Sequence, residues 1–295
     1  MSSTRRDRLV GASTQVATEV SINFGSSVAG LLIPVVGSIV VVAARQVVTA
    51  AVVLPFYRPK RAELTWRRLW PALALGVVLA AMNLSFYEAV GRLGLGIAAT
   101  IEFLGPFALA LVGSRRLLDA GCAVAAAAGV FLLTATEGAI DPLGVVLALT
   151  AAAAWAAYIL LTRQVATRLP GLEGLSVASV VSTVLTVPLA LIVVDYSRLD
   201  LRILLMLLAL GVLSSAVPYS LDTFILRRLT ARLYAVITSF GPVIATVFGV
   251  IVLGEHFSLV QLVGILIVCA AAGLTIATQR DTPRSELEQT AEAVP

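Results

Sequence analysis

Long apolar runs separated by short polar breaks dominate the pattern of this chain. A helix that crosses a lipid bilayer needs about 20 predominantly apolar residues, and ten stretches approach or reach that length. These predicted spans are residues 12–33, 36–56, 69–90, 95–113, 118–136, 143–163, 174–194, 203–225, 233–253 and 259–278. The short alternating segments of a membrane β-barrel are absent from the sequence. The pattern therefore predicts an all-α polytopic membrane protein with ten transmembrane helices.

The composition agrees with a membrane protein and excludes a soluble globular domain. Of the 295 residues, 59% are hydrophobic and only 13% are charged, whereas soluble domains carry about 25% charged residues. Cys122 and Cys269 both lie within apolar runs, so neither a disulfide framework nor a cysteine metal site is expected. We therefore expect no metal and no cofactor. The sequence also lacks catalytic and phosphate-binding motifs, so we do not expect an enzyme.

The formal net charge of +4 indicates a membrane topology and not a nucleic-acid partner. With both termini placed in the cytoplasm, 17 of the 21 lysine and arginine residues fall in cytoplasmic segments and three in external loops. The remaining one, Arg45, lies within a predicted span. This bias follows the positive-inside rule and predicts cytoplasmic N- and C-termini. The polar tail, residues 279–295, is predicted to be a disordered cytoplasmic segment.

The two halves of the chain resemble each other when the sequence is shifted by 136 residues. The shift places Gly105–Pro106 on Gly241–Pro242 and Arg92–Leu93 on Arg228–Leu229. Each half holds five predicted spans, and the halves are residues 12–136 and 143–278. Because five is an odd number, the second half must enter the membrane in the opposite orientation. The sequence thus predicts an inverted repeat, which is typical of secondary transporters.

Four ionisable side chains fall within the predicted spans, namely Glu19, Arg45, Glu102 and Asp222. Charges are costly in hydrocarbon, so each of the four is a functional candidate. The structural alternative is that they form ion pairs or hydrogen bonds that lock helix packing. One cation cannot neutralise three carboxyls, so at least one carboxyl holds a proton part of the time or lines water. Glu102 is the first candidate for proton coupling, because Asp222 lies nearer the cytoplasmic end of its span.

The two Gly-Pro pairs predict matched interruptions of the fourth and ninth spans. A proline lacks the N–H that would bond the carbonyl four residues earlier. Pro106 therefore frees the carbonyl of Glu102, and Pro242 frees that of Thr238. Helices interrupted at matching positions in two halves indicate a substrate site near the membrane midplane. A single proline, by contrast, often only kinks a membrane helix.

Polar and aromatic side chains at helical spacing suggest which residues face a substrate. Asn83 and Tyr87 share one face of the third span, and Trp155 and Tyr158 share one face of the sixth. The alternative for Trp155 and Tyr158 is a place in the interfacial aromatic belt. The predicted substrate-binding residues are Asn23, Arg45, Asn83, Tyr87, Trp155, Tyr158 and Tyr219.

From about residue 17 to residue 278 the chain resembles the drug/metabolite transporter superfamily with tandem EamA halves, and it is most like the bacterial threonine/homoserine exporters. The similarity rests on Glu102-Phe103-Leu104-Gly105-Pro106, Met82-Asn83 with Phe86-Tyr87, Trp155 to Leu160, and Pro218 to Leu221. Arg45 occupies the place where this family commonly has an arginine in its second helix. Asp222 stands where these exporters have glutamate, Asn23 stands where glutamine is expected, and Glu19 has no acidic counterpart.

The resemblance implies a multi-pass secondary transporter of the bacterial cytoplasmic membrane, acting as a monomer or homodimer. Its expected activity is export of small amino acids or related metabolites by proton antiport and alternating access. A drug-like cation exporter and a metabolite importer are alternatives within the same superfamily. An intramembrane enzyme or a channel is a remote alternative. The expected partners are a small-molecule substrate, protons and the lipid bilayer.

Overall fold

The computed structural model of the protein describes residues 5–57, 65–112, 114, 116–134, 141–218, 221, 225 and 228–278. All regular secondary structure in these residues is helical. Two predicted site residues, Tyr219 and Asp222, lie outside the described residues, as does the predicted tail 279–295.

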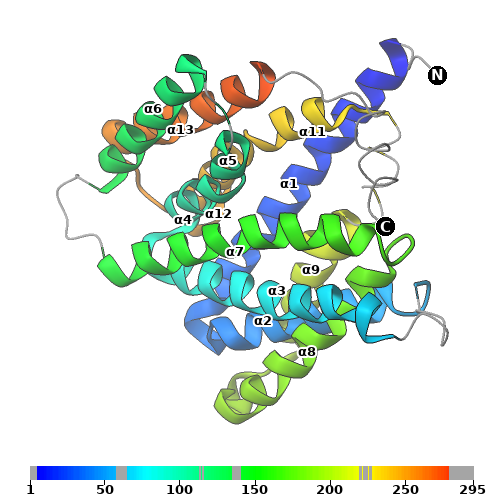
Figure 1. Ribbon diagram of the computed structural model, residues 1–295. Helices are drawn as coiled ribbons and strands as arrows, with labels where there is room; N and C mark the ends of the chain where they lie inside the picture. The colour runs from blue at the N-terminus through cyan, green and yellow to red at the C-terminus, as the bar shows by residue number, and fades with distance from the viewer. Residues whose placement is uncertain are drawn as a thin grey trace.

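Figure 1 shows the helices as one bundle. The first half of the chain forms α1 (Arg5–Val36), α2 (Ser38–Val53), α3 (Trp66–Leu93), α4 (Leu95–Glu102), α5 (Leu104–Leu111) and α6 (Leu117–Thr134). The second half forms α7 (Pro142–Ala166), α8 (Glu173–Val193), the 3₁₀ turn η2 (Tyr196–Arg198), α9 (Leu201–Gly211), the π-helical turn η3 (Val212–Ala216), α11 (Ala231–Thr238), α12 (Gly241–Leu253) and α13 (Leu259–Thr278).

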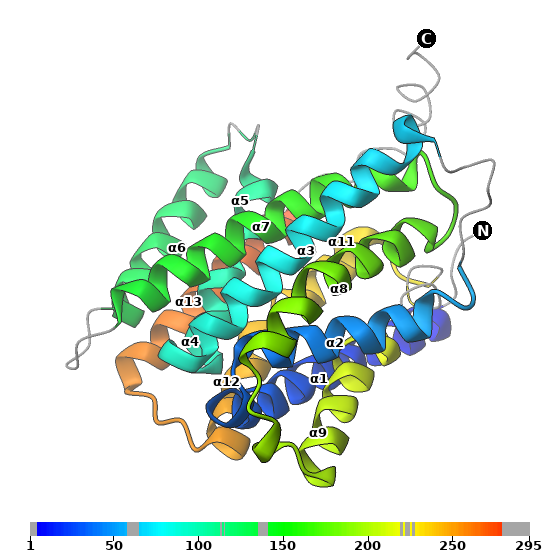
Figure 2. The same cartoon turned by 90° about the horizontal axis from the view of Figure 1, so that it is seen from below.

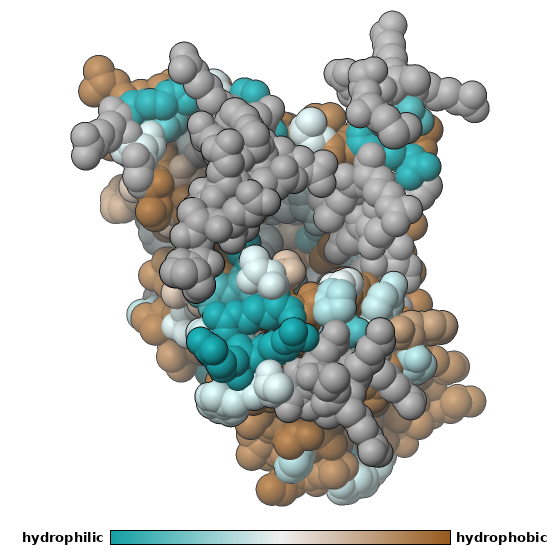
Figure 3. Space-filling model, turned by 45° about the vertical axis from the view of Figure 1, so that its right-hand side comes forward, coloured by the Kyte–Doolittle hydropathy of each residue, from teal (hydrophilic) through white to brown (hydrophobic). Residues whose placement is uncertain are grey.

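The helices are those of a polytopic membrane protein. Seven helices of the described chain are long and apolar enough to cross a bilayer, and three shorter apolar helices accompany them. Each of the ten predicted spans overlaps one of these helices. Apolar side chains cover the lower part of the face in Figure 3, while polar side chains gather at its centre and top. The inverted repeat and the cytoplasmic termini stay predictions.

Helix α3 lies between α7 and α8, and α2 packs on the other side of α8 (Figure 2). Both ends of the α3–α7 pair are fastened by side chains. At one end Arg92 forms an ion pair with Asp141, with 2.8 Å between Nη1 and Oδ2, and this hydrogen bond lowers the pKa of Asp141. At the other end Arg168 donates to the carbonyl of Arg67 at 2.5 Å and stacks over Trp70. The two helices are therefore antiparallel and held in register.

Glycine allows the helices α6 and α13 to approach closely. A side chain placed at Gly129 would come within 2.8 Å of the carbonyl oxygen of Gly264, and one at Gly264 would meet the carbonyl of Gly129. Membrane helices associate through such small-residue contacts, because lipid supplies no hydrophobic force between them.

Two half-helices of equal length stand at matching positions in the two halves. Helix α4 ends at Glu102 and α5 begins at Leu104, while α11 ends at Thr238 and α12 begins at Gly241. Helices α4 and α11 have eight residues each. The 136-residue shift that aligns the Gly-Pro pairs also aligns the first and last residues of α4 with those of α11. The similarity between the halves therefore extends from sequence to helix boundaries.

The inverted arrangement predicts that the loop before α3 and the loop before α9 lie on opposite sides of the membrane. Both Thr65 and Ser197 are exposed in these loops. In a protein lacking Cys122 and Cys269, we expect a membrane-impermeant maleimide to label Ser197→Cys in intact cells and Thr65→Cys only after permeabilisation. Labelling of both positions from the same side would contradict the inversion.

Candidate functional site

A cluster of hydrogen bonds orients the guanidinium of Arg45 inside the bundle. Arg45 lies on α2, and its partners come from α3 and η3. Its Nη1 donates to Asn83 Oδ1 at 2.6 Å and to Tyr87 Oη at 3.1 Å. Its Nε donates to Ser215 Oγ at 3.1 Å, and its Nη2 donates to the carbonyl of Ser214 at 3.2 Å. Three helices therefore meet at one arginine.

The partners of Arg45 are themselves held in place. Tyr87 is fully buried and Asn83 nearly so. The amide nitrogen of Asn83 donates to the carbonyl of Leu79 at 2.7 Å, which turns its amide oxygen toward Arg45. The Arg45 guanidinium also lies 5.9 Å from the centroid of the Tyr87 ring. These neutral partners fix the plane of the guanidinium.

Pro218 removes a backbone donor from the turn that contains Leu213 and Ser214. In an α-helix the N–H at position 218 would bond Ser214, and in a π-helix it would bond Leu213, but proline has no N–H. Both carbonyls instead accept side-chain donors from other helices. Leu213 accepts from Ser21 Oγ at 2.7 Å, and Ser214 accepts from Arg45. The π-helical turn at a polar site thus connects α1 and α2 to the end of α9.

A second polar group lies on α1 and faces the break between α11 and α12. Gln15 Nε2 donates to Glu19 Oε1 and to Thr238 Oγ1, both at 3.1 Å. Glu19 Oε2 lies 3.4 Å from the position that a Cβ at Gly241 would occupy. The Glu19 carboxyl therefore sits at the first turn of α12, where the helix dipole favours negative charge. Asn23 donates to the carbonyl of Glu19 in its own helix at 2.9 Å.

Glu102 is the last residue of α4 and its side chain is half-buried. It makes no hydrogen bond or ion pair within the described part of the chain, but it lies within electrostatic range of Arg45. The cation on α2 therefore acts electrostatically on this carboxyl of α4.

The break after Glu102 packs directly against α7. The rings of Phe103 and Trp155 meet edge to face at 5.8 Å. A side chain at Gly105 would collide with the backbone of Ala152. Pro106 follows in the first turn of α5, and Pro242 holds the equivalent place in α12. Trp155 and Gly105 thus position the interrupted helix.

The structure therefore brings together Arg45, Asn83 and Tyr87 in one group, and Glu19, Asn23 and Gly241 in another. Tyr158 packs against the apolar cluster that contains Leu75 and Val165. The carbonyl of Ser214 was not among the predicted site groups. Pro218 lies four residues after Ser214, so the relation that links Pro106 to Glu102 also links Pro218 to Ser214.

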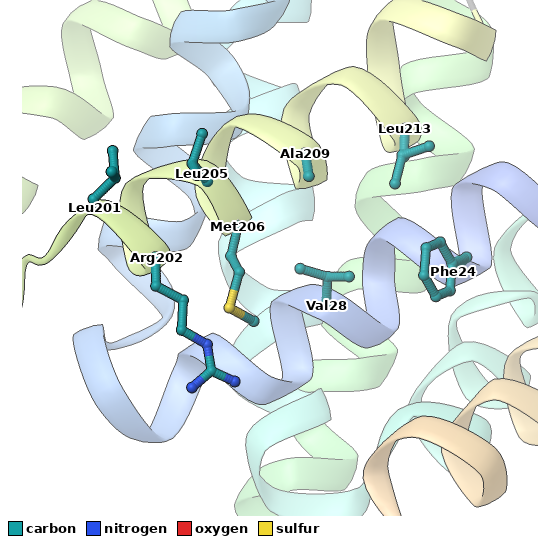
Figure 4. Close-up of a pocket in the computed structure, with 8 residues that line it drawn as sticks. All are labelled: Phe24, Val28, Leu201, Arg202, Leu205, Met206, Ala209 and Leu213. Atoms are coloured by element: carbon teal, nitrogen blue, oxygen red, sulfur yellow. The ribbon is translucent and has the colours of Figure 1, made fainter.

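A groove of about 620 Å³ lies on the outer surface between α1 and α9. Figure 4 shows Phe24 and Val28 of α1 facing Met206, Ala209 and Leu213, with Arg202 at one end. Its lining is apolar apart from that arginine, which suits lipid chains and not a small polar solute. The polar groups around Arg45 and Glu19 are the better candidate for a solute site.

A multi-pass helical bundle with interrupted helices and ionisable groups in its interior defines a membrane transporter. Residues 142–277 match the model of the EamA-like transporter family. The chain is 36% identical over 265 residues to the threonine/homoserine exporter RhtA of Salmonella typhimurium strain SL1344, covering 88% of this chain and 90% of the relative. It is 34% identical over 272 residues to RhtA of Escherichia coli strain K12, covering 91% and 92%.

This chain belongs to the EamA-like transporter family of the drug/metabolite transporter superfamily, with the threonine/homoserine exporters among its relatives. A solved crystal structure of another protein matches it with a TM-score of 0.61 and 19% sequence identity, covering 93% of this chain and 97% of the other. That likeness concerns the fold alone. The predicted family is confirmed.

The contact between Gly105 and Ala152 predicts that Gly105→Ala destabilises the protein. Overpacking of this kind costs about 1–3 kcal/mol in the free energy of unfolding. Gly121 of α6 is the matched control, because nothing lies within 4 Å of a side chain placed there. We expect Gly121→Ala to be neutral or to stabilise by up to about 1 kcal/mol. Thermal unfolding in detergent compares the two variants, and equal melting temperatures would contradict the close contact.

Proposed function

We propose that this protein exports small amino acids or related metabolites across a bacterial cytoplasmic membrane in exchange for protons. The observation that carries the proposal is the oriented guanidinium of Arg45, held by Asn83, Tyr87 and Ser214 within electrostatic range of the Glu102 carboxyl. The relatives named as threonine/homoserine exporters support the substrate class.

The two charged groups match the two ends of an amino acid. A guanidinium presents a planar set of donors that binds a carboxylate bidentately, and a carboxylate binds an ammonium group. Arg45 would receive the substrate carboxylate, and Glu102 would receive its ammonium group. A zwitterion brings an ammonium group that compensates the Glu102 carboxylate, so that carboxylate is not left as an unpaired charge in a buried site.

Proton exchange follows from the same pairing. When the substrate leaves, an ionised Glu102 would lose its ammonium partner in a site of low polarity. Protonation removes that charge, and release of the proton on the other side prepares the carboxyl for the next substrate. One carboxyl that binds either a proton or an ammonium group is the simplest basis for antiport. Glu19, at the first turn of α12, is a second carboxyl available to the same cycle.

Alternating access is supported by the half-helices α4 and α11. Each ends beside a break in the backbone, and the breaks lie next to the polar groups of the site. Discontinuous helices at corresponding positions carry the substrate site in many secondary transporters. Movement of one half-helix against the other would expose the site to one side of the membrane at a time.

Transport into proteoliposomes tests the proposal directly. Labelled threonine and homoserine, with and without an imposed pH gradient, are expected to move in a direction set by that gradient. A dye that reports internal pH is expected to show proton movement opposite to the substrate. Movement of an organic cation in place of the amino acids would instead support the cation exporter, and gradient-independent uptake would contradict proton antiport.

Arg45→Lys is predicted to reduce amino-acid transport at least about tenfold, because a lysine ammonium cannot reproduce the planar donor set. Such a change corresponds to about 1.4 kcal/mol. Arg202→Lys, in the apolar surface groove, is the matched control and is expected to transport normally. Thermal unfolding of both variants checks that they fold. Normal transport by folded Arg45→Lys would favour a purely structural arginine.

Glu102→Gln is predicted to abolish net transport driven by a pH gradient, because the amide cannot carry a proton through the cycle. Exchange of labelled for unlabelled substrate without a gradient reports separately whether the variant still binds and moves substrate. Asp195→Asn, in an exposed loop, serves as a control for loss of a carboxylate. If Glu102→Gln keeps full gradient-driven transport while Asp222→Asn loses it, the coupling carboxyl is Asp222.

A further inference from the structure

Glu255 ties the loop between α12 and α13 to the first turn of α4. Its Oε1 accepts from the N–H of Leu95 at 2.5 Å, and its Oε2 accepts from the N–H of Gly96 at 3.3 Å. The carboxyl fits between two glycines, since a side chain at Gly94 or Gly249 would collide with it. Gly94 also has φ +84°, which disfavours other residues. The first N–H groups of a helix have no partner within the helix, and here a carboxylate supplies it.

The packing of the half-helices differs between the two halves. Helix α4 packs along α12, and a side chain at Gly96 would come within 2.8 Å of Thr246 Oγ1. No comparable packing joins α11 to α5 among the residues that the structure describes. On the side that holds Glu255, α4 is therefore packed against α12. The corresponding helices of the other half, α11 and α5, are not packed against each other in the described residues.

The 136-residue shift identifies that counterpart. It places Asp119 on Glu255, and it places Ala231–Arg232 on Leu95–Gly96. The positive-inside pattern assigns Glu255 to the external side and Asp119 to the cytoplasmic side. The two carboxyls thus occupy matching positions in the two halves, on opposite sides of the membrane. The same shift matches the first turn of α4 with the first turn of α11.

Asp119 is buried but only partly bonded. Its side chain is 2% exposed, and its Oδ2 accepts from Ser114 Oγ at 2.5 Å. Its Oδ1 is buried and finds no hydrogen-bond partner among the described residues. The carboxyl lines a pocket of about 270 Å³ together with Ser114, Arg116 and Leu117. A buried carboxyl oxygen without a partner is costly, which suggests that its partner belongs to another conformation.

The first turn of α11 and the pocket of Asp119 are both joined to the end of α13. Arg232 donates to the carbonyl of Ala277, and Arg116 donates to the carbonyl of Thr278 at 2.6 Å. Both arginines therefore hold the last turn of α13. The pocket of Asp119 and the first turn of α11 lie beside the same helical turn.

We propose that Asp119 and Glu255 are alternating latches, one for each side of the membrane. In the state described, Glu255 caps α4 and holds the external side closed. In the opposite state, Asp119 caps α11 at Ala231 and Arg232 and holds the cytoplasmic side closed, while Glu255 releases α4 to water. This inference rests on the proposed alternating access and names the groups that stabilise its two end states.

A purely structural role for Asp119 makes a different prediction. A carboxylate in the first turn of α6 stabilises its own helix through the helix dipole. Removing it would then lower the melting temperature without changing the balance between the two states. The latch predicts that the two carboxylates have opposite effects on that balance.

Distances between pairs of spin labels, measured in lipid nanodiscs, report the ratio of outward-open to inward-open molecules. The external pair is Leu93→Cys with His256→Cys, and the cytoplasmic pair is Leu118→Cys with Leu233→Cys, both in a Cys122→Ala, Cys269→Ala background. Glu255→Ala should raise the ratio of outward-open to inward-open molecules about five- to tenfold, the effect expected for loss of a helix cap. Asp119→Ala should lower the ratio by a similar factor, and the double variant should return near the unmodified ratio.

Asp200→Ala is the matched control, because Asp200 caps α9 through the N–H of Ile203 at 2.8 Å without joining two moving parts. It should reduce stability and leave the ratio unchanged. The latch proposal is overturned if Asp119→Ala behaves like Asp200→Ala, or if both latch variants shift the ratio in the same direction. Amino-acid transport by the unmodified protein is measured in parallel. If transport holds and the distances do not shift, only the latches fail; if the distances shift without amino-acid transport, the proposed substrate fails.

Discussion

Inside a bilayer no water satisfies a backbone group that leaves a helix, and each unsatisfied N–H or C=O costs several kcal/mol. The polar features of this protein follow from that constraint. Pro218 has no N–H to donate to the preceding turn, and the carbonyls of Leu213 and Ser214 in that turn accept side-chain donors from α1 and α2. The first turn of α4 uses Glu255, and the first turn of α11 uses Thr230, whose hydroxyl accepts from Leu233. Polar side chains therefore gather where the helices are interrupted, and the proposed solute site lies among them.

The packing contacts of the bundle distinguish its long helices from the two short half-helices. Helices α3 and α7 are fastened at both ends, and α6 and α13 approach each other through Gly129 and Gly264. These contacts run along whole helices and resist sliding, because closely packed surfaces have few alternative arrangements. The half-helices α4 and α11 have eight residues each and end in breaks. In the proposed cycle, these short helices exchange their caps and change partners while the rest of the bundle stays packed.

Sequence reasoning reached the parts of this molecule that depend on local chemistry. Hydropathy located the helices, and proline chemistry located both breaks near Gly105 and Gly241. The rarity of arginine in hydrocarbon selected Arg45, and helical spacing selected Asn83 and Tyr87, which the structure places beside it. Spacing shows which residues share a helix face but not what that face contacts, so the packing of Tyr158 against the cluster of Leu75 and Val165 could not be predicted. Glu255 could not be linked to α4 from spacing, because its partner is distant in the chain and the contact exists only in the folded bundle.

The 136-residue shift that aligns the two halves also shows which features are repeated and which occur only once. The half-helices and their breaks recur in both halves, and the shift matches Glu255 with Asp119. The charged candidates of the site do not recur, because Glu19 corresponds to Trp155, Arg45 to Val181, and Glu102 to Thr238. Trp155 still contacts one break as Glu19 contacts the other, so the positions are equivalent while their chemistry differs. In the proposed mechanism the repeated backbone gives two related conformations, whereas Glu19, Arg45 and Glu102 occur once and give a single site. A transporter needs that combination, since one substrate site must be reached in turn from both sides of the membrane.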